Sequence, residues 1–213
     1  METTGSTIGP ALLAALDDGV RGVEAAAAAV TDWRAPTACP DWTAVDLAGH
    51  LLVAAGYYHR LLDAAERGRP LADRPDGVEL AAWNARNLAA LDVGEGDDPP
   101  ERLGPARIAA FGRTARAWHE RLRTADADRP LAHWRTLGVL TVGEHAGVIT
   151  GEWHLHAWDL GRAAGHPHRP ADPATVLAAR GRVLHPDTVV GSGDPWERVL
   201  ALSGRSAQPE RPS

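Results

Sequence analysis

The sequence predicts an all-α protein in which four long helices form a bundle and short C-terminal helices pack against it. Apolar residues recur at steps of three or four in several long segments, which is the spacing of one helical face. Capping motifs and Asp-Pro pairs mark where several of these segments begin. No segment shows the alternation of a half-buried strand, and no repeat of fixed period is present.

The first half of the chain contains three predicted helices. The first runs from Ile8 to about Val30, and the prolines between Trp33 and Asp41 then predict a loop. Thr43-Ala-Val-Asp46 matches a capping box, with Asp in place of the usual Glu, and begins a second helix. That helix ends at Gly68, and a third is expected from Val78 to Leu91.

The second half of the chain contains two more predicted bundle helices, joined by a long connection. A fourth helix is expected from Glu101 to Ala125, followed by a connection without regular structure from Asp126 to Leu140. Thr141-Val-Gly-Glu144 is a capping box, and its helix should reach Ala164 before Gly165 ends it.

Two Asp-Pro pairs predict the short C-terminal helices, at about 173–184 and 195–203. Residues 206–213 are polar and are expected to be a disordered tail, so that residues 1–205 form one domain.

Composition excludes several functional classes. The formal net charge is −6 without a run of like charge, which argues against binding to nucleic acid or to an anionic membrane. No apolar stretch is long enough to span a membrane, and no signal peptide is recognisable. The single cysteine, Cys39, allows no internal disulfide, so a reducing, cytoplasmic location is expected.

A metal site is the strongest functional prediction. Glu152 and His156 are four residues apart, so they share one face of a helix. His50 lies on the apolar stripe of the second helix, and bundles build metal sites from such inward side chains. One carboxylate and two imidazoles suit Zn²⁺, Ni²⁺ or Fe²⁺ and leave positions open for water or substrate.

Less specific interpretations compete with this one. A lone histidine such as His50 is more often a hydrogen-bonded core residue, and Glu152 with His156 could be a pair on a helix surface. His154 faces the opposite side of the helix. His145 lies too far along the helix to bind the same ion, although it could line a pocket.

Three segments resemble one known family. Cys39-Pro-Asp-Trp-Thr-Ala-Val-Asp-Leu-Ala-Gly-His50-Leu is similar to the segment CPGWTVRDLVAHL of the DinB/YfiT-like superfamily, and more narrowly of the metal-binding domain of mycothiol-dependent maleylpyruvate isomerase. The segment Glu152 to Gly165 resembles E-x-x-x-H-G-W-D-L-A-R-A-T-G, and Asp194 to Arg205 resembles D-R-L-L-A-x-x-G-R. Together they span most of the chain, from about Ile8 to Arg205.

The resemblance implies a DinB-like four-helix bundle with His50, Glu152 and His156 as the metal ligands. Members of the family transfer thiols such as mycothiol, or isomerise a substrate through a thiol adduct. This chain has Asp41 and Ala157 where glycine is usual. It also lacks the separate C-terminal domain of the two-domain isomerases, which argues against that particular reaction.

The expected function is therefore a divalent-metal-dependent thiol S-transferase or thiol-dependent isomerase, with mycothiol or a related thiol and a small electrophile as substrates. Two alternatives stay open: a thiol-independent enzyme in which the metal is a Lewis acid, such as a hydrolase, isomerase or cyclase, and a non-catalytic metal- or ligand-binding bundle. Tyr57, Arg86 and His145 are pocket candidates, and the protein is expected to be a monomer or homodimer. Four tryptophans near the site are expected to be core or lid residues: Trp42, Trp83, Trp153 and Trp158.

Overall fold

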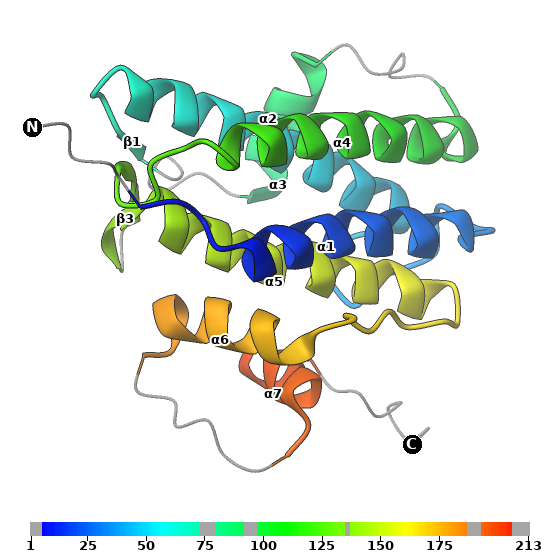
Figure 1. Ribbon diagram of the computed structural model, residues 1–213. Helices are drawn as coiled ribbons and strands as arrows, with labels where there is room; N and C mark the ends of the chain where they lie inside the picture. Colours follow the sequence, from blue (N-terminus) through cyan, green and yellow to red (C-terminus); the bar gives the residue numbers. More distant parts are fainter. Residues whose placement is uncertain (1–5, 73–79, 92–97, 135–136, 187–192, 206–213) are drawn as a thin grey trace, which may run out of the picture.

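Four long helices form the bundle, as the sequence predicts. The computed structural model describes residues 6–72, 80–91, 98–134, 137–186 and 193–205, so the predicted tail at 206–213 lies outside the described residues. The bundle helices are α1 (Pro10–Ala28), α2 (Ala44–Glu66), α4 (Pro100–Leu122) and α5 (Val142–Ala163). Helix α1 packs along α5 and α4, and α2 packs along α4 (Figure 1). The all-α fold class is thereby confirmed.

Local sequence signals set the helix ends. The side chains of Thr43 and Thr141 each accept a hydrogen bond from the backbone N–H three residues on, at Asp46 and Glu144. The side chains of these two acidic residues accept a hydrogen bond from the backbone N–H of the threonine, which completes each capping box. Gly68 and Gly165, just beyond α2 and α5, adopt φ values of 67° and 78°, which favour glycine.

Three shorter helices complete the described chain. Helix α3 (Leu80–Ala89) packs on α2, α6 (Pro173–Leu184) packs on α5, and α7 (Pro195–Leu202) packs on α6. In Figure 1, α6 and α7 lie below α5, on the side away from α2 and α4. None of the helices in the described part of the chain is long and apolar enough to cross a membrane.

The expectation that residues 126–140 lack regular structure was wrong. A small sheet of order β1-β2-β3 forms, in which β2 (Pro130–Trp134) pairs parallel with β1 (Leu71–Ala72) and antiparallel with β3 (Gly138–Thr141). A register shift between Pro130 and Ala132 places two buried residues in succession, which hides the alternation of a strand. Strand β3 leads directly into α5.

Helix α5 is the centre of the molecule, because it is buried on both sides. Of its 22 residues, 17 are buried, whereas a helix at the surface of a bundle buries one face only. Trp153 packs into the core shared with α1, α2 and α4. Leu155 and Trp158 belong to a second apolar cluster with residues of α6 and α7. A functional side chain on α5 is therefore held from two sides.

Buried histidines are also part of this core. His145, on α5, is fully buried, and its ring contacts the rings of Tyr58, Trp118 and Trp134 at centroid distances of 4.9, 6.0 and 6.4 Å. Neither ring nitrogen has a hydrogen-bond partner. Burial without a partner disfavours the imidazolium and lowers the pKa of His145 to about 3.

Gly161→Ala and Gly181→Ala should change stability in opposite directions. A Cβ at Gly161 would lie 2.4 Å from the backbone oxygen of His166, so we expect a loss of about 2 kcal/mol in the free energy of unfolding. A Cβ at Gly181, within α6, would meet nothing within 4 Å, so alanine there should add about 0.5–1 kcal/mol. Urea denaturation measures both, and a destabilising Gly181→Ala would contradict the packing described for α6.

His145→Phe should flatten the acid side of the pH–stability profile. Between pH 6.5 and about 3 the unfolded chain binds a proton at residue 145 that the folded chain does not, so stability falls as the pH falls. Between pH 7 and pH 5 we expect this loss to be about 2 kcal/mol in the wild type and absent at this position in the variant. The exposed His166→Gln variant is the control, and an unchanged slope in His145→Phe would refute the assignment.

Candidate metal centre

The structure brings the three predicted ligand residues to one cavity. Helix α2 supplies His50, and α5 supplies Glu152 and His156, one turn apart on the same face. The His156 Nε2 lies 3.7 Å from the Glu152 Oε2, and the rings of His50 and His156 are 5.2 Å apart with their planes at 83°. All three residues line a cavity of about 600 Å³.

Each histidine has one ring nitrogen held by an oxygen acceptor. His50 Nδ1 lies 3.2 Å from the Asn84 Oδ1, and His156 Nδ1 lies 3.0 Å from the Asp159 Oδ2. When Nδ1 is the donor of such a bond, Nε2 is the nitrogen that can bind a metal, which is the usual support of metal-bound histidines. Two ligands of a tetrahedral Zn²⁺ are about 3.4 Å apart, close to the distance between Glu152 and His156. Glu152 and His156 are therefore spaced like two ligands of one divalent ion, and His50 lines the same cavity.

The carboxylate of Glu152 is oriented by Arg180 of α6. The Arg180 Nη1 donates a hydrogen bond to Oε1, while Oε2 is the oxygen nearest His156. Burial raises the pKa of Glu152, but the charges of Arg180, His156 and His50 outweigh burial and lower it below its ordinary value. Glu152 is therefore an ionised ligand.

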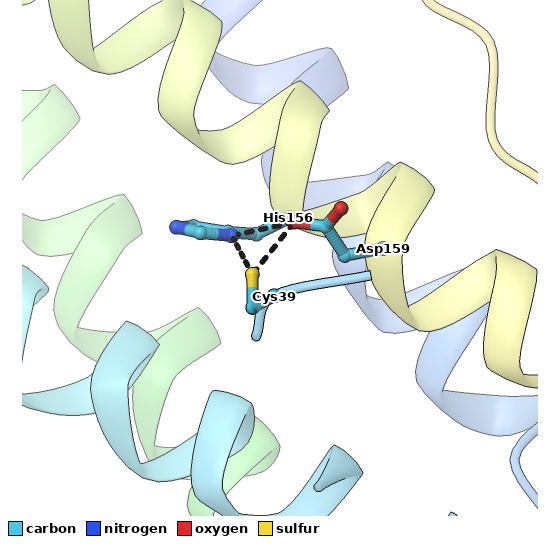
Figure 2. A group of neighbouring side chains, drawn as sticks. All are labelled: Cys39, His156 and Asp159. Carbon is cyan, nitrogen blue, oxygen red and sulfur yellow. Dashed lines mark hydrogen bonds and ion pairs between the residues drawn. The ribbon is translucent and has the colours of Figure 1, made fainter. Parts of the chain in front are cut away.

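Behind His156 lies the buried carboxylate of Asp159. Its Oδ2 accepts a hydrogen bond from the Cys39 Sγ at 3.2 Å (Figure 2). Arg205 donates two further bonds at 2.8 Å, from Nε to Oδ1 and from Nη2 to Oδ2. Burial raises the pKa of Asp159, but Arg205 and His156 lower it far below its ordinary value.

The carboxylate in turn makes His156 strongly basic. Burial lowers the pKa of His156, but hydrogen bonds to Asp159 and Cys39 outweigh burial and raise it to about 10. A metal that binds Nε2 would displace the proton on that nitrogen, while Asp159 would keep the Nδ1 proton in place.

Cys39, His156 and Asp159 are themselves a second candidate metal group, because their ligand atoms lie within 4.8 Å of one another. This group would use His156 Nδ1, whereas the group with His50 and Glu152 would use Nε2. The oxygens of Asp159 already accept four hydrogen bonds, two of them from Arg205. The arrangement is therefore better suited to orienting His156 than to holding an ion.

Five Trp and Tyr side chains line the cavity. The Trp42 ring lies 4.8 Å from that of His50, and Tyr57 meets Trp83 edge to face at 5.3 Å. Tyr58 and Trp134 line the same cavity. The other two tryptophans expected near the site do not line the cavity. Trp153 packs in the core of the bundle, and Trp158 packs in the apolar cluster between α5, α6 and α7.

The three pocket candidates occupy different places. Tyr57 lines the cavity, His145 is buried in the core beside Tyr58 and Trp134, and Arg86 is exposed on α3 and is not among the lining residues. His154 faces away from the cavity, as expected, and its Nε2 bonds to the Ala15 oxygen at 3.0 Å.

Sequence reasoning missed the residues that support the ligands: Asn84, Asp159, Arg180 and Arg205. A signal existed only for Asp159, which is three residues from His156 and therefore within reach on the same helix. Asn84, Arg180 and Arg205 lie on other elements, 34, 28 and 46 residues from their partners.

The loop before α2 carries Cys39 to the cavity. Its ends are joined by a bridge between Pro36 and Thr43, and the Thr37 Oγ1 bonds to the Trp42 oxygen at 3.0 Å. Asp41 has a φ of 64°, a conformation that favours glycine but that Asp tolerates better than most residues. The glycine usual at this position in the resembling family is thus explained by the backbone.

The chain matches one known family over most of its length. The family described as "Mycothiol maleylpyruvate isomerase N-terminal domain" matches residues 10–161, which include α1 to α4, most of α5 and all three candidate ligands. No curated protein and no solved structure gives a significant match. On the strength of the family match, the chain belongs to the mycothiol maleylpyruvate isomerase N-terminal domain family.

Proposed function

We propose that this protein is a divalent-metal-dependent enzyme that joins a low-molecular-weight thiol of the mycothiol type to a small electrophile, as a transferase or a thiol-dependent isomerase. The ligands are His50, Glu152 and His156, and the ion is Zn²⁺, Ni²⁺ or Fe²⁺. One observation carries the proposal: two histidines with Nδ1 held by oxygen acceptors meet an ionised carboxylate at the wall of a cavity of about 600 Å³.

Each part of the site has a distinct task. A divalent ion bound there would lower the pKa of a coordinated thiol and favour the reactive thiolate. Asn84 and Asp159 orient the two imidazoles, and Arg180 orients Glu152. The aromatic walls keep water from the reacting groups, and Tyr57 is placed to orient the substrate.

An external thiol explains why the cavity needs no nucleophile of its own. Cys39 lines the cavity, but its Sγ is bonded to Asp159 behind His156.

The two alternative functions would need different features of the site. A thiol-independent Lewis-acid enzyme would use the same ligands with a substrate oxygen, whereas a non-catalytic bundle would not need space beside the ion. The size of the cavity favours a catalytic role.

Metal content separates the two ligand groups. His50→Ala should reduce bound zinc from about one ion per chain to a small fraction, since it removes one of three ligands. Cys39→Ser should retain the ion, because the thiol is not a ligand in our assignment. Elemental analysis after dialysis measures both, with the exposed His166→Ala as the control. Loss of zinc in Cys39→Ser with retention in His50→Ala would move the site to Cys39, His156 and Asp159.

Thiol dependence separates the proposed reaction from its alternatives. With mycothiol and a generic electrophile, removal of the metal by a chelator should slow the reaction at pH 7 at least about 30-fold, which is the gain from converting a thiol of ordinary pKa fully to thiolate. Readdition of zinc should restore the rate. Turnover in thiol-free buffer would favour the Lewis-acid alternative, and no turnover by zinc-loaded protein under either condition would favour a binding role.

A further inference from the structure

We propose that the electrophile accepted by this cavity is an uncharged, planar aromatic or conjugated molecule, and that the cavity selects against dicarboxylates such as the maleylpyruvate in the name of the family. This inference rests on the proposed function, because it names the substrate class of the same site.

The shape of the wall favours a planar apolar ligand. Five aromatic side chains line the cavity, from the loop before α2, from α2, from α3 and from β2: Trp42, Tyr57, Tyr58, Trp83 and Trp134. Aliphatic side chains of α2, α3 and α5 fill the spaces between them. Aromatic walls stack well on a flat π-system, whereas they offer few partners to a group that needs several hydrogen bonds.

The charges of the wall disfavour anions. The chain contains no lysine, and among the described residues that line the cavity no arginine occurs, whereas Asp41 and Glu152 are both acidic. His156 also lines the cavity, but its ring is already paired with Asp159 at 3.0 Å and lies 3.7 Å from Glu152. The two arginines nearest the ligands are already paired, Arg180 with Glu152 and Arg205 with Asp159. Burying a carboxylate without a partner is costly.

The ion itself would leave little charge for a dicarboxylate. A divalent cation is neutralised by Glu152 together with one thiolate, so neither carboxylate of such a substrate would find a surplus positive charge. Arg107 is the exception to consider, because it lines a separate pocket of about 280 Å³ that shares Asp41, Trp42 and His50 with the main cavity. Its Nη1 donates to the Val45 oxygen at 3.0 Å, and its side chain lines this second pocket together with His50.

Direct binding tests the preference without any turnover. Protein freed of zinc by a chelator is titrated calorimetrically at pH 7 with 2-naphthol, 2-naphthoate and maleate, because zinc without a bound thiolate would itself coordinate a carboxylate. The first two share one ring system and differ in charge. We expect 2-naphthol to bind at least about tenfold more tightly than 2-naphthoate, and maleate most weakly.

Two variants probe the wall. Leu80→Arg places a cation at the cavity and should reduce the preference for 2-naphthol over 2-naphthoate at least about fivefold. Trp83→Leu should weaken 2-naphthol about tenfold while leaving zinc content unchanged. Far-ultraviolet circular dichroism checks that each variant is folded. If a variant is unfolded, the relative affinities of the wild-type protein for 2-naphthol, 2-naphthoate and maleate test the inference by themselves.

Arg107→Gln distinguishes the two pockets. Tight binding of 2-naphthoate or maleate that survives in Arg107→Gln would overturn the inference. Anion binding that disappears in this variant would place the anion in the side pocket and support the preference of the main cavity for uncharged ligands.

These binding measurements involve no thiol. A failure of thiol transfer would therefore refute the proposed function and leave the preference for uncharged ligands standing, while a reversed preference would refute this inference alone.

Discussion

The geometry of the site depends on the buried carboxylate of Asp159. Its side chain is fully buried, and such a charge is tolerated only when it is paired and hydrogen-bonded. Arg205 supplies the countercharge, while His156 and Cys39 donate the remaining bonds. Three segments far apart in the sequence are thereby joined: the loop before α2, the second half of α5 and the residues after α7. Removing one partner of a buried pair costs about 3–5 kcal/mol, so the fold and the orientation of His156 are stabilised by the same contacts.

This arrangement gives the C-terminal helices a role in the site as well as in packing. The family match ends at residue 161, within α5, and therefore includes the three candidate ligands but not α6 or α7. Arg180, which orients Glu152, lies on α6, and Arg205 follows α7. Because α6 and α7 also cover the second apolar cluster of α5, they keep solvent away from the groups that fix the charges of Glu152 and Asp159.

The sequence could predict those parts of the molecule that local chemistry determines. The caps at Thr43 and Thr141 and the glycine at 165 set helix ends, and the four-residue spacing of Glu152 and His156 set their shared face. Two other kinds of feature could not be predicted from the sequence.

The hairpin of β2 and β3 is short and irregular in register, so no alternation of apolar and polar residues marks it. The bonds of Asn84, Arg180 and Arg205 join different elements, and no periodicity within one helix specifies a partner on another.

Asp41 shows how this chain can differ in chemistry from its family while keeping the same backbone. The left-handed conformation at this residue explains the glycine usual there, and aspartate is one of the few side chains that adopt it at modest cost. The substitution therefore leaves the loop in place, with Cys39 still beside His156. It also adds a negative charge to the cavity wall, where Glu152 is the other acidic lining residue. A backbone conformation suited to glycine thus coexists with an added acidic side chain at the cavity wall, which supports the proposed preference for uncharged substrates.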